Sequence, residues 1–280
     1  MNQAPHTEIP NAVAKRFAAL QAQSRKALIP FFTAGYPSPA ETMRLALTAS
    51  SAGADLLELG MPFSDPLADG PAIQQSSHEA LESGLKMKDT FNIVEKVTSK
   101  TNMPVVLMGY YNPIGALGVT GFVRSAKSAG VSGLIVPDLP PEESGELRAA
   151  AEDSNMALTF LIAPTTTLNR YQTIADSSTG FVYAVTVAGV TGARRSFATE
   201  TDTYLQAVKR NIAKPVVAGF GIANGESARR MARRVDGVVV GSAFIELQRT
   251  NPRVRARTAV GRLVEEIRKS LDSLDSGVIT

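Results

Sequence analysis

The chain has 280 residues, a formal net charge of +3 and no cysteine, with 44% hydrophobic and 20% charged residues. This composition excludes a disordered protein, a disulfide scaffold and a thiolate metal site, and the length suits a single α/β barrel. The basic residues are scattered rather than gathered in one stripe, so nucleic acid is not an expected partner.

The first ten residues are polar and contain proline, which predicts a loose tail. They contain no cationic segment followed by an apolar run, so we expect no secretory signal. No apolar stretch reaches the length of a membrane span, so we expect no membrane association and a cytoplasmic protein. Residues 11–23 follow, and their apolar positions at helical spacing predict an extra N-terminal helix.

Eight short apolar segments alternate with helical patterns along the rest of the chain. The gaps between them carry helix signals, among them Ser38, Pro39 and Glu41, which together predict a capping box. Asn224 likewise precedes a pattern of period 3.6 and predicts a helix cap. The predicted strands are residues 27–33, 54–60, 103–110, 132–136, 157–162, 180–186, 214–219 and 236–241.

Strands that alternate with helices indicate a parallel sheet, and eight such units of roughly 35 residues indicate a closed (β/α)8 TIM barrel. The first strand is followed by Thr33-Ala-Gly-Tyr-Pro37, which is no dinucleotide fingerprint, so an open doubly wound sheet is disfavoured. We expect one domain over residues 1–280, a last helix over 252–271 with a solvated basic face, and a second loose tail over 272–280.

Glu58 stands out because it interrupts an apolar strand. An ionised carboxylate there is costly unless it is paired or works with a raised pKa. Gly60 and several prolines end the strand, and the loop that follows carries Asp65 and Asp69. Two readings remain open at this point: Glu58 is a catalytic acid, or it is a structural acid bonded to backbone N–H groups or an Arg. Asp65 is more simply explained as an Asx turn.

In a (β/α)8 barrel the active site lies at the C-terminal ends of the strands, so residues from different strand ends converge there. The seventh and eighth strands end in glycine turns, which expose backbone N–H groups beside the start of a short helix at Ser242 and so predict a phosphate site. The same glycines are also consistent with plain turns. The converging residues are Glu58, Asp69, Met108, Tyr110, Asp138, Tyr183, Gly219, Phe220, Gly221, Gly241 and Ser242.

The loop after the sixth strand is longer than a connector requires. Gly189 and Gly192 supply hinges, and Thr191 and the two arginines that follow fit a mobile lid over a ligand, although the arginines are also consistent with a solvated surface. Tyr183 fits either the site or the core, and Asp138 is more simply a cap for the next helix. The two histidines, His6 and His78, look like bystanders, so no metal site is predicted.

Several motifs resemble one known family. The segment of residues 57–71 reads LELGMPFSDPLADGP and is similar to the signature loop of the tryptophan synthase alpha chain. Five further motifs follow in that family's order: LMGYYNP from Leu107, VPDLP from Val136, APTT from Ala163, GVTG from Gly189 and GFGI from Gly219. The resemblance extends from about residue 12 to 270. The departures are slight: Met61 stands where Val or Ile is more usual, and Thr186 where Ser is common.

The resemblance implies a carbon–carbon lyase that cleaves indole-3-glycerol phosphate to indole and glyceraldehyde 3-phosphate in the last step of tryptophan biosynthesis. It also implies a beta-chain partner in an alpha2-beta2 tetramer, with pyridoxal phosphate on the beta chain and no cofactor on this one. The implied catalytic pair is Glu58 as proton shuttle and Asp69 as partner of the indole N–H, two carboxylates in unlike environments.

The remaining roles divide between the ring and the phosphate of that substrate. Tyr183 is expected to position Glu58, and Thr191 to lie in the lid. The residues expected to sandwich the indole are Phe31, Met108, Tyr110 and Phe220. The residues expected to bind the phosphate through backbone N–H groups are Gly192, Gly221, Gly241 and Ser242.

Two other functions remain as alternatives. Another phosphate-binding barrel enzyme of the same pathway would ordinarily need a Cys or a Lys at a strand end, and the chain offers neither. A non-catalytic barrel that binds a phosphate ligand and activates a partner would have no need of Glu58 within an apolar strand.

Overall fold

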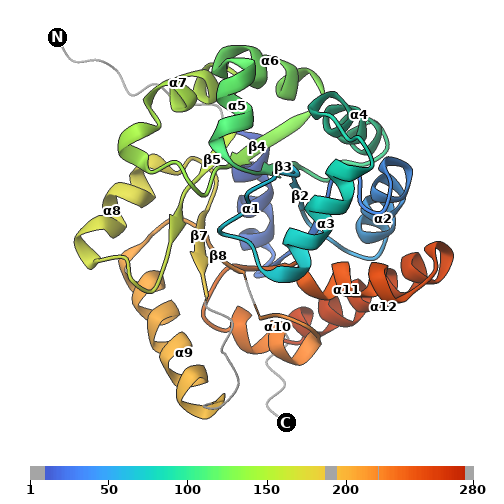
Figure 1. Ribbon diagram of the computed structural model, residues 1–280. Helices are drawn as coiled ribbons and strands as arrows, with labels where there is room; N and C mark the ends of the chain where they lie inside the picture. The colour runs from blue at the N-terminus through green and yellow to red at the C-terminus, as the bar shows by residue number, and fades with distance from the viewer. Residues whose placement is uncertain (1–9, 187–193, 220, 275–280) are drawn as a thin grey trace.

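The computed structural model describes residues 10–186, 194–219 and 221–274, and within 194–199 only the helical backbone. Strands and helices alternate along these residues as the sequence predicts (Figure 1). The strands are β1 (Ala27–Thr33), β2 (Leu57–Gly60), β3 (Val105–Met108), β4 (Val131–Ile135), β5 (Ala157–Thr159), β6 (Leu161–Ile162), β7 (Val182–Val185), β8 (Val216–Gly219) and β9 (Gly237–Val240).

The helices surround the sheet in Figure 1, except for α1, which lies behind its centre. Their bounds are α1 (Ala12–Ala22), α2 (Pro39–Ser51), α3 (Pro71–Glu82), α4 (Met87–Thr98), α5 (Tyr111–Leu117), α6 (Val119–Ser128), the 3-10 turn η1 (Pro141–Glu143), α7 (Gly145–Asp153), α8 (Leu168–Ser177), α9 (Arg194–Asn211), α10 (Gly225–Ala232), α11 (Ser242–Thr250) and α12 (Arg253–Asp272).

All strand pairs are parallel, in the order β5-β4-β3-β2-β1-β9-β8-β7-β6, so the sheet curls into a nearly closed barrel. This confirms the predicted (β/α)8 barrel. The predicted fifth strand is divided at Phe160 into β5, which pairs with β4, and β6, which pairs with β7. At the division, the Phe160 N–H donates to the Ser178 hydroxyl (3.2 Å) and the Leu158 N–H to the Thr179 hydroxyl (2.9 Å). Backbone bonds remain from the Thr179 N–H to the Leu158 carbonyl (2.9 Å) and from the Tyr183 N–H to the Phe160 carbonyl (3.0 Å), so loop hydroxyls replace only part of the ladder at this place.

Helix α1 closes the N-terminal end of the barrel. Its buried face, Val13, Phe17 and Leu20, packs in one apolar cluster with residues that point into the barrel, and the rings of Phe17 and Phe181 lie 5.4 Å apart. Asn11 caps the helix, as its side chain accepts from the Ala14 N–H (2.9 Å). With that end filled, the C-terminal end of the barrel is where a cavity can open.

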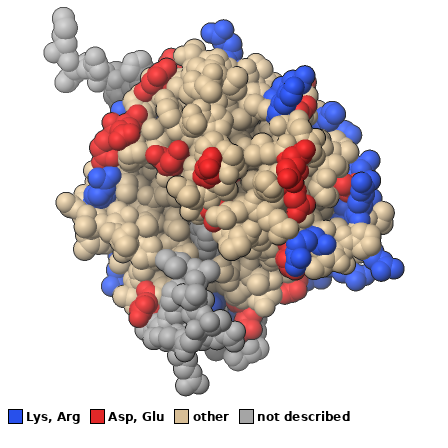
Figure 2. Space-filling view, viewed as in Figure 1, with Lys and Arg blue, Asp and Glu red and all other residues tan. Residues whose placement is uncertain are grey.

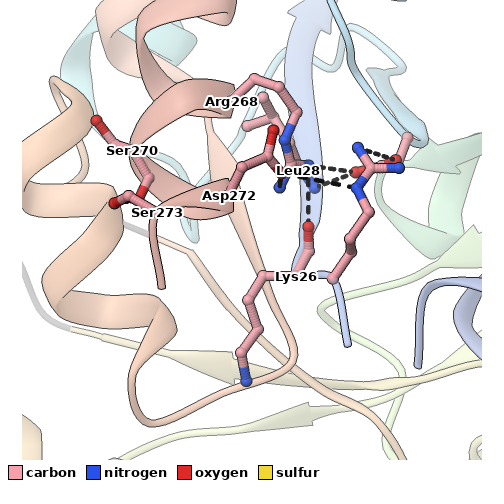
Figure 3. A network of polar contacts seen from close by, with 8 residues as sticks. Lys26, Leu28, Arg268, Ser270, Asp272 and Ser273 are labelled. Carbon is pink, nitrogen blue, oxygen red and sulfur yellow. Dashed lines mark hydrogen bonds and ion pairs between the residues drawn. The ribbon is translucent and has the colours of Figure 1, made fainter. Parts of the chain in front are cut away.

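A buried ion pair ties the last helix to the base of the barrel (Figure 3). The Arg268 Nη1 atom donates to Asp55 Oδ2 (2.9 Å) and to the Lys26 carbonyl (3.0 Å), and Asp55 Oδ2 also accepts from the Leu28 N–H (2.9 Å). Arg268 is only 7% exposed, so the expectation that the arginines of this helix form a solvated face is wrong for this residue. An arginine can lie on the inner face because Asp55, remote in sequence, meets it there.

The predicted capping box of α2 forms only in part. The Ser38 hydroxyl accepts from the Glu41 N–H (3.3 Å), as expected of an N-cap. The Glu41 carboxylate does not return the bond, because it pairs instead with Arg44 (2.5 Å) and with Arg257 of α12 (3.4 Å). No helix in the described part of the chain is both long and apolar enough to traverse a bilayer.

Candidate active site

Glu58 lies in the middle of β2, paired in register with Phe31 of β1 and Val106 of β3. The side chain is 1% exposed, and within the described structure Oε2 has no hydrogen-bond partner. Burial, with a smaller contribution from the charge of Asp69, raises the pKa of Glu58 to about 8. The carboxyl group is therefore largely protonated at neutral pH and holds a proton that it can give to a ligand.

Asp69 lies in the loop that leads from β2 to α3. The Asp69 N–H donates to the Pro66 carbonyl (3.1 Å), and the Gln74 amide donates to the Asp69 carbonyl (2.9 Å). Hydrogen bonds therefore fix both the N–H and the carbonyl group of Asp69. Burial raises the pKa of Asp69 to about 6, and the Tyr110 hydroxyl, 3.3 Å from Oδ2, opposes that rise. At neutral pH this carboxylate is mostly ionised, in contrast to Glu58.

Tyr110 supports this loop. Its hydroxyl accepts from the Ala68 N–H (2.8 Å) while it donates to Asp69, and its ring stacks on Phe63 with centroids 5.0 Å apart. Tyr110 is not among the residues that line the cavity described below, where the sequence led us to expect it against a flat ring. The structure places it beside Asp69 instead.

A cavity of about 520 Å³ opens between the strand ends, α3 and α11. It brings together both carboxylates and most of the described residues that the sequence singles out. These are Phe31, Glu58, Asp69, Met108, Tyr183, Gly221, Gly241 and Ser242. Most of the surface is apolar, which suits a flat hydrophobic ligand with a few polar groups.

Two glycines at strand ends make room for aromatic side chains that line the cavity. A Cβ atom at Gly219 would lie 2.0 Å from the Tyr183 hydroxyl, and one at Gly60 would lie 2.5 Å from the Phe31 ring. Gly219 is therefore needed by Tyr183, rather than by a phosphate as its sequence motif indicated. Gly221 differs, because it has φ of +75° and open space beside it, as a turn with exposed N–H groups requires.

Helix α11 begins at Ser242, as predicted, directly after β9. Gly241, Ser242 and Ala243 all line the cavity, so the N-terminal end of this nine-residue helix borders it. Unpaired N–H groups and the helix dipole make such an end favourable for an anion. Gly221 lines the same cavity, which brings the two predicted phosphate turns together.

The sequence analysis missed several residues of the cavity wall. Glu246 is the one with a charge, and its position four residues after Ser242, on the same helical face, was the signal that could have found it. The others are Gly70, Pro71, Ala72, Ile73, Ile222, Ala223, Val239 and Ala243.

Other candidates lie elsewhere. Asp138 accepts from the Tyr111 N–H (3.0 Å) and so caps α5, which lies earlier in the chain, where we expected it to cap the helix after it. His78 is exposed on α3 and pairs with Glu82 (3.2 Å). In the described part of the chain no three acidic or histidine side chains gather as a metal site would need. The site predictions for Thr191, Gly192 and Phe220 fall outside the described residues, as do those for Gly189 and His6.

Comparison with known proteins agrees with this arrangement. The family model of the tryptophan synthase alpha chain matches residues 17–272, nearly the whole chain. The protein belongs to that family. The alpha chain from Citrifermentans bemidjiense is 46% identical over 234 residues, which cover 84% of this chain and 88% of that protein. The alpha chain from Azoarcus sp. is 44% identical over 259 residues, which cover 92% and 96%.

The fold is also similar to that of solved structures of this family. The crystal structure of tryptophan synthase subunit alpha from Legionella pneumophila superposes with a TM-score of 0.86 at 33% identity, covering 94% of this chain and 99% of that one. Membership makes this tryptophan synthase alpha chain a carbon–carbon lyase of tryptophan biosynthesis, which cleaves indole-3-glycerol phosphate. It works with a beta chain, and pyridoxal phosphate belongs to that beta chain.

Proposed function

We propose that Glu58 is the proton shuttle of the cleavage. Breaking the bond between indole and its glycerol phosphate arm is a reverse aldol reaction, in which carbon 3 of the ring gains a proton and the side-chain hydroxyl loses one. Glu58 is protonated at neutral pH because it is buried, and one of its oxygens has no protein partner. It gives the proton to carbon 3 and then, as a carboxylate, takes the proton of the hydroxyl as the aldehyde forms.

Asp69 has the complementary role of accepting a hydrogen bond from the indole N–H. The ring nitrogen becomes more acidic as carbon 3 is protonated, so an ionised carboxylate beside it stabilises the transition state. The lower pKa of Asp69, about 6, supports this division of roles. The single observation that carries the proposal is that two carboxylates of unlike pKa line one cavity.

The remaining cavity residues fit the rest of the substrate. Phe31 and Met108 contact the ring, Tyr183 lies beside the ring and Glu58, and the backbone at Gly221, Gly241 and Ser242 binds the phosphate. The sequence assigns Phe220 to the ring, Gly192 to the phosphate and Thr191 to the lid. We further propose a single domain, an alpha2-beta2 tetramer and a cytoplasmic location, all of which the family resemblance supports.

Replacing Glu58 by Gln tests the central role. The amide keeps the shape but cannot shuttle a proton, so indole release from indole-3-glycerol phosphate should fall by about 10² to 10⁴. Binding of glycerol 3-phosphate should stay unchanged. Glu95→Gln, an exposed change on α4, is the matched control and should retain full turnover.

Unchanged turnover in Glu58→Gln would refute the role of Glu58. Failure of the parent chain to release indole, alone or with a beta chain, while it still binds glycerol 3-phosphate, would instead favour a binding and activating subunit.

A further inference from the structure

The charges around the cavity do not match the substrate that we propose for it. Its described lining residues include three acids, Glu58, Asp69 and Glu246, and no Lys, Arg or His. A phosphate ester carries close to two negative charges at neutral pH. Backbone N–H groups and the end of α11 supply only partial positive charges. A carboxylate near the phosphate end therefore needs compensation if binding is to be tight.

Glu246 is the acid that matters at this end. It lies four residues after Ser242, so it is on the same face of α11 and about 6 Å further along the helix axis. The Arg249 hydrogen bonds lower the pKa of Glu246, so this carboxylate is ionised throughout the neutral range. Its charge opposes the favourable effect of the helix terminus on an anion.

Arg249 compensates that charge directly. Its Nε atom donates to Oε2 of Glu246 (3.0 Å) and its Nη2 atom donates to Oε1 (2.7 Å), so both carboxylate oxygens are occupied. Both residues also line a second hollow of about 340 Å³, which shares Pro71 and Ala72 with the main cavity. The guanidinium group thus lies just outside the substrate cavity.

Other groups act on Arg249 as well. The hydrogen bonds and charge of Glu246 raise the pKa of Arg249 most, and the charge of Glu79, from α3, adds a smaller contribution. In the view of Figure 2, which is that of Figure 1, acidic side chains lie in the middle of the visible face and basic side chains lie mainly toward its rim. Among the described residues, Arg249 is the cation that is hydrogen-bonded to Glu246.

We propose that Arg249 sets the affinity of the site for the phosphate group by neutralising Glu246. It acts through Glu246 and does not itself line the substrate cavity, so it is a positioning residue. The inference rests on the proposed phosphate position at Gly221, Gly241 and Ser242. In this protein, phosphate binding then depends on an ion pair one helical turn away from the binding N–H groups.

Charge removal at this pair tests the proposal. In low salt, Arg249→Gln should raise the KM for indole-3-glycerol phosphate and the Kd for sn-glycerol 3-phosphate about fivefold, as one unit charge about 8 Å from a doubly charged group in water would. The kcat should not change. The effect should shrink in 1 M salt, where the Debye length is about 3 Å. Glu246→Gln/Arg249→Gln should bring both constants back toward those of the parent.

If Arg249 served only to hold α11 in place, the double variant would not recover the parent constants, because removing Glu246 as well would not return a displaced helix to its position. Arg234→Gln, which breaks the partly exposed Arg234–Asp202 pair (3.2 Å), is the matched control and should leave both constants unchanged. An unchanged Kd in Arg249→Gln at low salt, or a double variant as weak as the single one, would overturn the proposal. Failure of the parent to bind sn-glycerol 3-phosphate would overturn it too. A parent that binds but does not turn over would count against the proposed function alone, since the Kd still decides this inference.

Discussion

Asp55 and Glu58, two buried acids at and just before β2, differ in whether the protein supplies partners for their carboxyl groups. Asp55 and Glu58 are 4% and 1% exposed, and burial raises the pKa of both. Asp55, at the base of the barrel, is bonded by Arg268 and by the Leu28 N–H. Glu58, toward the open end, has an oxygen without a described partner and faces a cavity. Burial alone therefore does not distinguish a working acid from a structural one.

The difference lies in what neutralises the charge. For Asp55, the Leu28 N–H and the Arg268 guanidinium group oppose the rise in pKa that burial causes, so fixed partners compensate the charge of this carboxylate. Glu58 has neither, so protonation is the way in which it avoids a buried charge, and that proton is available to a ligand. Three experiments test this contrast, in order of decreasing effect.

Arg268→Met should lower the stability of the protein and leave its kcat nearly unchanged. It leaves the buried Asp55 with the Leu28 N–H (2.9 Å) and a longer contact to Arg25 (3.8 Å) but without its buried guanidinium partner, so the free energy of unfolding should fall by about 3–5 kcal/mol, while kcat of the folded protein stays within about twofold. Chemical denaturation and an indole-release assay measure the two. Asp55→Asn/Arg268→Met should recover part of the loss, because the Asn side chain can still accept from the Leu28 N–H. A large drop in kcat at full stability would mean that the base of the barrel shapes the site.

The pH dependence should separate Glu58 from Asp69. Glu58 acts when protonated, so kcat/KM should fall as pH rises through about 8. Asp69 acts when ionised, so kcat/KM should also fall as pH drops through about 6. Between pH 4.5 and 8 the folded protein holds a proton on Glu58 that the unfolded chain releases. Stability relative to Glu58→Gln should therefore decline as pH rises in this window, by at most about 1.4 kcal/mol per unit. A flat profile between pH 5 and 9 would contradict both assignments.

Tyr110→Phe should give the smallest effect. The variant loses the donor that holds the pKa of Asp69 down, so the acidic limb of kcat/KM should move above pH 6 and activity at pH 6.5 should fall about threefold. The alkaline limb, set by Glu58, should stay in place. Tyr171→Phe, a change on α8 in the outer apolar core, is the control. An acidic limb that does not move would show that Tyr110 serves the loop only.

The sequence predicted the barrel because alternation of apolar strands with amphipathic helices is a local signal that every unit repeats. It also singled out Glu58, since a carboxylate within an apolar strand is visible in one window of sequence. It could not pair Asp55 with Arg268, because 213 residues separate them and neither lies in a motif. Tyr110 and Asp138 do lie in motifs, but the groups they bond, Asp69 and the Tyr111 N–H, are 41 and 27 residues away, so no single window of sequence shows these contacts.

The division at Phe160 has a consequence for the closure of the barrel. β5 and β6 stand at the two ends of the strand order, yet only Phe160 separates them along the chain. This fifth strand is tied to the segment that leads into β7 by two backbone bonds, from the Thr179 N–H to the Leu158 carbonyl (2.9 Å) and from the Tyr183 N–H to the Phe160 carbonyl (3.0 Å), as well as by the hydroxyls of Ser178 and Thr179. Covalent continuity and mixed main-chain and side-chain bonds thus complete the circle at the place farthest in strand order from β1, the strand that carries Phe31.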